Sequence, residues 1–128
     1  LLGLKKLKKL YEYASGTGME ILVEPHHRDE FFKVLDMGAE LIGINNRDLE
    51  KMKVDNSHII SVLEDVPQEM LKGRTIVCES GIDDIPYMER LFKMGVNTFL
   101  IGTYFMSSPR LGDTLARFGE GLKEKGLI

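Results

Sequence analysis

Four short apolar runs, each ending in a polar residue or a glycine, constrain the fold of this chain most strongly. The runs are Glu20–Glu24, Leu41–Asn45, Thr75–Glu79 and Asn97–Gly102, and a helix-like segment follows each one. Apolar strands separated by helices predict a parallel α/β sheet covered by helices. Doubly wound sheets and (βα)8 barrels both fit this pattern, and both place functional residues at the carboxyl ends of the strands.

The helix-like segments are recognised by apolar spacing and by their start and stop residues. We expect helices over residues 3–15, 29–37 and 57–64, one that begins after Asp83 or Asp84, and a last one from Ser108-Pro109. Asp55 is a candidate cap for the third helix. We expect loops from Asn45 through Lys53 and over Pro67–Gly73. The lysines of the first helix are expected to form a solvated face, and an anionic partner is the alternative.

Length and charge bound the class of protein. With 128 residues and a net charge of −3, the chain is expected to be one domain that does not bind nucleic acid. Its single cysteine, Cys78, excludes an internal disulfide and is expected to be buried. His26 and His27 lack the spacing of metal ligands, so no metal is expected. Because the chain begins with Leu1, not Met, we expect that the true start of the protein precedes it.

Polar residues and glycines gather where the four runs end. The polar ones are Glu24, Asn45, Arg47, Glu79, Ser80 and Thr103, and the glycines are Gly81 and Gly102. Two carboxylates beside amides can perform acid–base chemistry, because partial burial moves the pKa of a glutamate toward the working pH. The alternative is that Glu24 and Glu79 form structural ion pairs. Their equivalent positions in the repeat favour a functional role.

Glycines on the last two strand ends indicate anion binding. Gly81 and Gly102, the latter followed by Thr103, would let a phosphate approach backbone N–H groups, and a helix N-terminus nearby would add a favourable dipole. Barrels commonly bind phosphate at the loops after their last two strands. Ser80 lacks the Gly-x-Ser-x-Gly context of an activated nucleophile.

The motifs VEPHH, GINNRDL, VCESGI and FLIG, in this order and spacing, resemble those of indole-3-glycerol phosphate synthase. The resemblance implies a ribulose-phosphate-binding (βα)8 TIM barrel, of which residues 1–128 would be the carboxyl half, strands five to eight. It implies a carbon–carbon lyase of tryptophan biosynthesis. That enzyme converts 1-(2-carboxyphenylamino)-1-deoxyribulose 5-phosphate to indole-3-glycerol phosphate with loss of carbon dioxide and water, and it uses no cofactor.

The resemblance also implies a role for each strand-end residue. Glu24 matches the catalytic base of the family, and Glu79 matches the catalytic glutamate of the seventh strand. Asn45 matches the asparagine that holds the substrate hydroxyls, and Arg47 lies just beyond it. Ser80 lines the substrate pocket beside Glu79. Gly81, Gly102 and Thr103 match the phosphate cradle. Pro25 stands where the family usually has valine, and Thr103 replaces a serine but keeps the hydroxyl.

One departure affects the activity. The family's catalytic lysines lie on strands that this chain does not match, so the chain by itself is expected to be inactive. The alternative is a non-catalytic half-barrel that binds a phosphorylated metabolite or pairs with a partner half. An open half exposes strand edges and apolar surface, so a complementary half or self-association is expected. A cytoplasmic location is expected, with an organelle as the alternative, and no membrane association.

Overall fold

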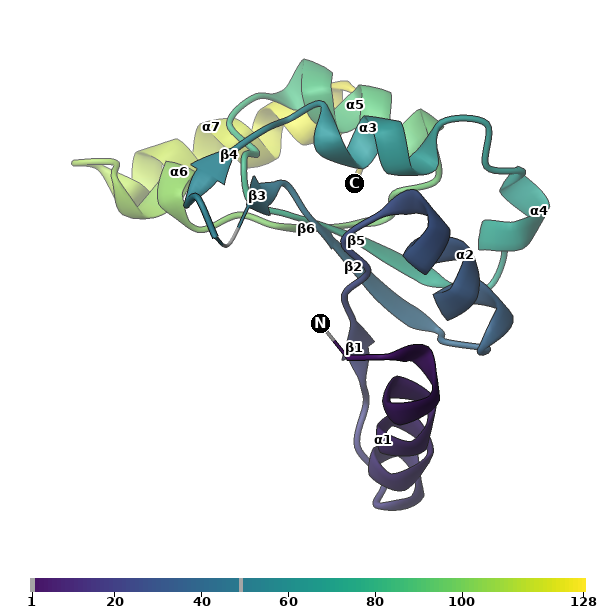
Figure 1. Ribbon diagram of the computed structural model, residues 1–128. Coiled ribbons are helices and arrows are strands. Elements are labelled where there is room, and N and C mark those ends of the chain that lie inside the picture. Colours follow the sequence, from purple (N-terminus) through teal and green to yellow (C-terminus); the bar gives the residue numbers. More distant parts are fainter. Residues whose placement is uncertain (1, 49) are drawn as a thin grey trace.

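The computed structural model describes residues 2–48 and 50–128, and Leu1 and Leu49 (the last residue of the GINNRDL motif) lie outside the described residues. A parallel four-stranded sheet has the order β1-β2-β5-β6 (Figure 1). Its strands are β1 (Leu22–Val23), β2 (Leu41–Asn45), β5 (Thr75–Glu79) and β6 (Thr98–Leu100). A separate hairpin pairs β3 (Arg47–Asp48) with β4 (Lys53–Val54).

Helices alternate with these strands along the chain. They are α1 (Leu4–Gly16), α2 (Arg28–Asp36), α3 (His58–Leu63), α4 (Gln68–Leu71), α5 (Ile85–Lys93), α6 (Thr103–Met106) and α7 (Leu111–Glu124). The predicted parallel α/β architecture is therefore confirmed. No helix in residues 2–48 or 50–128 combines the length and the apolar character needed to cross a membrane.

The register places the strand ends at one edge of the sheet. Asn45, the last residue of β2, is opposite Glu79, the last residue of β5, and Glu79 is opposite Leu100 of β6. The backbone N–H of Asn46 extends this ladder by donating to the Glu79 carbonyl oxygen at 2.8 Å. The polar residues that follow β2, β5 and β6 are consequently neighbours in space.

The two faces of the sheet differ in their cover. Alternate residues point to opposite faces, and one set is fully buried beneath α2, α3 and α5: Ile42, Ile44, Ile76 and Cys78 (Figure 1). The opposite set includes Leu22 and Leu100, whose side chains are 40% and 59% exposed. Among the described elements, no helix covers that second face. This is the arrangement of part of an α/β barrel, whose inner face closes only when the remaining strands are present.

Several predicted boundaries are confirmed and others are wrong. The helix predicted to begin after Asp83 or Asp84 is α5, and Asp84 caps it by accepting a hydrogen bond from the Tyr87 N–H at 2.7 Å. Pro86 lies in its first turn. Asp55 does not cap α3. Its carboxylate instead accepts from the N–H and hydroxyl of Ser57, the residue before the helix.

Four other differences concern short elements. The outer strands β1 and β6 are shorter than predicted, because each pairs with only one neighbour. The segment through Lys53 forms a hairpin and not a loop, Pro67–Gly73 contains α4, and Gly102 is followed directly by α6. Elements of two to four residues are too short for periodicity to detect.

Candidate functional site

A cleft at the carboxyl edge of the sheet contains five of the eight predicted site residues. It has a volume of about 620 Å³, and Arg47, Ser80, Gly81, Gly102 and Thr103 all line it. They come from the segments that follow β2, β5 and β6. Glu24, Asn45 and Glu79 do not line this cleft.

The turn after β5 forms one wall of the cleft. Ser80 has a φ of 64° and Gly81 a φ of 73°, so both lie in the left-handed region, which is unusual for serine. A Cβ atom on Gly81 would lie 2.1 Å from Asn56 Oδ1 and 2.6 Å from Val54 Cγ1. Gly81 is therefore required both by its backbone conformation and by the close approach of the β4–α3 segment.

The opposite wall, after β6, is open. A Cβ atom on Gly102 would meet no heavy atom within 4 Å. In the described part of the chain, no backbone carbonyl accepts a hydrogen bond from the N–H of Gly81 or Gly102. Gly81, Gly102 and Arg47 therefore bring two N–H groups without a backbone acceptor and a guanidinium to the same cleft, which Asp83 also lines. N–H groups and a guanidinium are the donors that an oxyanion requires.

Glu79 is buried on the open face of the sheet, beside β1. Its side chain is 6% exposed, and Oε1 has no hydrogen-bond partner among the described residues. Burial raises the pKa of the Glu79 carboxyl, and the negative charge of Glu24 raises it further. A glutamate that holds its proton more tightly than usual is suited to exchange protons near neutral pH.

Gly43 of β2 makes room for that carboxylate. A Cβ atom on Gly43 would lie 2.0 Å from Glu79 Oε1 and 3.2 Å from Leu22 Cδ1. Glu79 therefore reaches across β2 toward β1, the strand that precedes Glu24. Glu24 is exposed and lines a second pocket, about 480 Å³ in volume, between α1 and α2.

Asn45 and Arg47 are joined by a local hydrogen bond. The Arg47 N–H donates to Asn45 Oδ1 at 2.9 Å, which leaves the side-chain NH₂ of Asn45 without a partner in the described chain. Both residues are half-buried. Asn45 is thus placed opposite Glu79 with two donors available for a ligand.

Asn46, which is not among the predicted site residues, is the polar residue at this edge with the most hydrogen bonds. It is 1% exposed, and its Nδ2 donates to the Ser80 carbonyl oxygen and to Tyr87 Oη, at 3.3 and 3.1 Å. Its Oδ1 accepts from the Ile59 N–H at 3.1 Å. Strand alternation offered a signal, because it sends one of two consecutive asparagines into the helix layer.

The buried groups near Asn46 are held neutral. Burial raises the pKa of the Cys78 thiol to about 12, with a smaller contribution from Glu79, and the prediction of a buried cysteine is confirmed. Burial also raises the pKa of the Tyr87 hydroxyl to about 12. Neither group ionises near neutral pH, so both serve as fixed hydrogen-bonding groups.

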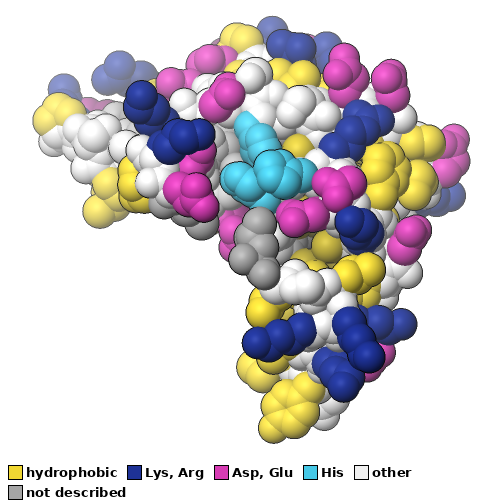
Figure 2. All heavy atoms as spheres, viewed as in Figure 1, with side chains coloured by type: hydrophobic (Ala, Val, Ile, Leu, Met, Phe, Trp, Pro, Cys, Tyr) yellow, Lys and Arg dark blue, Asp and Glu magenta, His cyan; other side chains and the backbone are white. Residues whose placement is uncertain are grey.

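Three histidines form a patch beside the sheet edge, flanked by acidic side chains (Figure 2). The ring centroid of His26 lies 4.7 Å from that of His27 and 5.4 Å from that of His58. Burial lowers the pKa of His58, and the charge of His26 lowers it further. Within residues 2–48 and 50–128, no set of three His, Cys, Asp or Glu side chains is placed to hold a metal ion.

Comparison with known proteins identifies the family. A family model described as indole-3-glycerol phosphate synthase matches residues 1–118. The chain is 39% identical to the indole-3-glycerol phosphate synthase of Aliarcobacter butzleri (strain RM4018), over 89% of this chain and 42% of that relative.

The corresponding enzymes of Campylobacter jejuni (strain RM1221) and Lachnospira eligens are 38% and 34% identical, each over 90% of this chain and 43% of the relative. The chain thus spans less than half the length of the curated relatives it matches. It belongs to the indole-3-glycerol phosphate synthase family, whose members are TIM barrels.

Proposed function

We propose that the complete protein is a lyase of tryptophan biosynthesis that forms indole-3-glycerol phosphate. It would close the ring of 1-(2-carboxyphenylamino)-1-deoxyribulose 5-phosphate with loss of carbon dioxide and water. The observation that carries this proposal is the cleft that Arg47, Ser80, Gly81, Gly102 and Thr103 share at the strand ends. Membership of the family supports it.

In this proposal the cleft receives the phosphate end of the substrate. The N–H groups of Gly81 and Gly102 and the hydroxyl of Thr103 would donate to phosphate oxygens. Arg47 would supply positive charge on the same side. The open space at Gly102 supports close approach of a phosphate to the backbone.

The acid–base end of the site would lie toward β1. Glu24 would act as the catalytic base, and Asn45 would hold the substrate hydroxyls with its unpaired NH₂ group. Glu79, whose pKa is raised by burial and by Glu24, would exchange a proton with the reacting part of the substrate. Ser80 would line the pocket between the two ends.

Ring closure also needs a proton donor at the ketone oxygen. The four lysines of α1 (Lys5, Lys6, Lys8 and Lys9) are exposed on a helix and not at a strand end, so they are not suited to this role. We expect the donor on the strands that residues 1–128 do not match, and we expect those strands to cover the open face of the sheet. The site would then be complete only in the whole barrel.

Turnover by the complete protein, isolated from its natural source, tests the proposal. Intact mass gives its length, and fluorescence of the indole product follows the reaction. We expect a chain of about 250 residues, the usual size of such a barrel, that converts the substrate. A 128-residue protein that binds inorganic phosphate without turnover would contradict the proposal and would favour the non-catalytic half-barrel.

A further inference from the structure

We infer that Asn46 and Tyr87 are positioning residues that hold the Ser80–Gly81 turn in the shape of the cleft wall. The inference rests on the proposed function, because it assigns these two residues to the cleft that would receive the phosphate. Neither Asn46 nor Tyr87 lines the cleft. They act through the residues to which they are hydrogen-bonded.

A directional chain of hydrogen bonds connects the two residues. The Tyr87 hydroxyl has one proton, which it donates to the Asn56 carbonyl oxygen at 2.6 Å. It can therefore only accept from Asn46 Nδ2, which is 3.1 Å away. This fixes the orientation of the Asn46 amide, with Nδ2 toward Ser80 and Oδ1 toward the N–H of Ile59.

The Ser80–Gly81 turn needs such support. A serine in the left-handed region is strained, and the conformation persists only where surrounding contacts enforce it. The Ser80 carbonyl oxygen accepts from Asn46 Nδ2 at 3.3 Å. We ascribe the retention of the turn to this buried donor, which water cannot replace at a side chain that is 1% exposed.

The same network fixes the segment that presses on Gly81. Tyr87 holds the backbone of Asn56, whose Oδ1 lies 2.1 Å from the place that a Cβ atom on Gly81 would take. Asn46 also accepts at its backbone oxygen from the Asp55 N–H at 2.8 Å. Because Ser80, Gly81 and Asn56 all line the cleft, one network determines the position of three lining residues.

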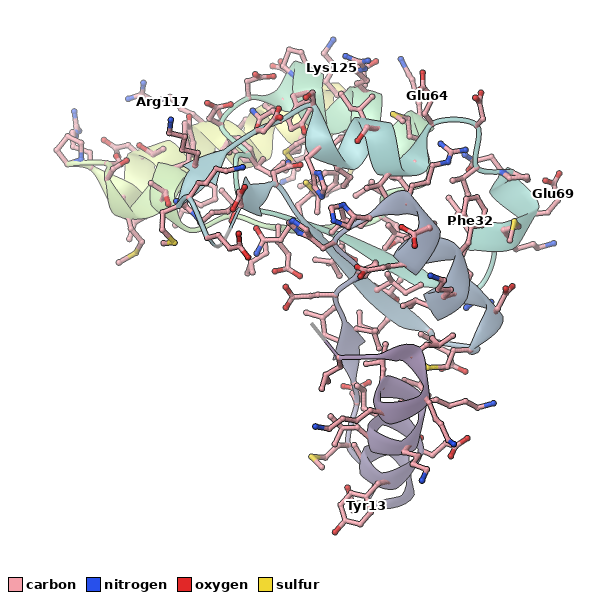
Figure 3. All side chains as sticks on the ribbon, in the orientation of Figure 1. Tyr13, Phe32, Glu64, Glu69, Arg117 and Lys125 are labelled. Carbon is pink, nitrogen blue, oxygen red and sulfur yellow. The ribbon has the colours of Figure 1, made fainter. Side chains whose placement is uncertain are left out.

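Tyr87→Phe is the most selective test, because it removes one oxygen and keeps the ring in place. Tyr13→Phe is the matched control, since Tyr13 is 74% exposed at the far end of α1 (Figure 3). In the ligand-free protein, we expect Tyr87→Phe to shift or broaden the amide NMR signals of Ser80 and Gly81. The signals of Gly102 and Thr103, on the opposite wall, should remain as in the wild type.

Inorganic phosphate is the ligand probe. The loss of one buried hydrogen bond should weaken phosphate binding by about three- to tenfold in Tyr87→Phe, and Tyr13→Phe should bind as the wild type does. In the complete protein, the same substitution should raise KM with little change in kcat, because the acid–base residues stay in place. A role in stability alone would lower the unfolding midpoint without these local changes.

Asn46→Ser is the second variant, and it removes the donor to Ser80 and Tyr87 together. It should reproduce the changes at Ser80 and Gly81, and it decides the question if Tyr87→Phe does not fold. Wild-type Ser80 and Gly81 signals in a folded variant would overturn the inference. Failure of the wild-type protein to bind phosphate would instead contradict the proposed function, because the ligand-free spectra test the positioning role separately.

Discussion

Replacing Gly43 with alanine tests how β2 places Glu79 in the site. The new Cβ atom would lie 2.0 Å from Glu79 Oε1 and 3.2 Å from both Glu79 Cδ and Leu22 Cδ1. Real atoms do not approach so closely, so the Glu79 carboxylate must move away from β2. We expect it to move toward solvent, because the opposite direction is filled by the core.

The cost in stability should be small for a buried clash. Overpacking a core typically costs about 1–3 kcal/mol. Here the displaced atom is the end of a flexible side chain, and Oε1 leaves a place where it has no hydrogen-bond partner. We therefore expect the free energy of unfolding to fall by about 1 kcal/mol, at the lower end of that range. The larger effect should be on the pKa of Glu79, which should decrease toward its ordinary value as burial is relieved.

Two measurements check this prediction, namely urea denaturation for stability and a carbon-13 NMR titration of the Glu79 carboxyl for its pKa. Gly119→Ala in α7 is the control, because its Cβ atom would meet nothing within 4 Å. It should stabilise the helix by about 0.5–1 kcal/mol. In a Glu79→Ala background, Gly43→Ala should cost less than in the wild type. An unchanged Glu79 pKa in Gly43→Ala would show that Gly43 does not determine the position of the carboxylate.

Glu79→Gln should stabilise the protein at neutral pH and not at pH 3. Folding raises the Glu79 pKa above its ordinary value of 4.5, so the stability of the wild type falls as the pH rises from 4.5 through the pKa of the folded state. Glutamine does not titrate, so the variant does not lose this stability. Equal effects at both pH values in urea denaturation would contradict this. Glu24→Gln should abolish turnover by the complete protein, measured by kinetics, and leave inorganic phosphate binding intact, measured by calorimetry. Retained turnover would show that Glu24 is not the base. Gly102→Val should place a side chain in the open cleft and weaken phosphate binding at least tenfold. Gly112→Ala, where the new Cβ atom also meets open space, should not weaken it. An unaltered dissociation constant for phosphate in Gly102→Val would mean that the phosphate site lies elsewhere.

The sequence predicted the central strands better than the outer ones, for a physical reason. Leu41–Asn45 and Thr75–Glu79 have the predicted bounds, because both are paired along their length and their apolar pattern is continuous. Glu20–Glu24 and Asn97–Gly102 lose residues at both ends, since an outer strand has one neighbour to pair with.

The site residues were predicted from chemistry and position together, because polar residues and glycines follow the strands at one edge of the sheet. Arg47, Ser80, Gly81, Gly102 and Thr103 do share one cleft. Gly43 and Asn46 were missed, because their roles depend on contacts with residues about 30 or more positions away in the chain. Gly43 makes room for Glu79, and Asn46 is hydrogen-bonded to Ser80 and Tyr87. Strand alternation puts Asn46 on the same face as the core residues Ile42 and Ile44, but local pattern cannot predict the partners that the packing of α3 and α5 brings to its side chain.

The most direct test of the central claim is a crystal structure of the protein with indole-3-glycerol phosphate bound. We expect the phosphate to lie in the cleft, with its oxygens in hydrogen-bond reach of the N–H groups of Gly81 and Gly102. The indole end should point toward Glu79 and Glu24. A phosphate bound elsewhere, such as in the pocket between α1 and α2, would contradict the proposed site.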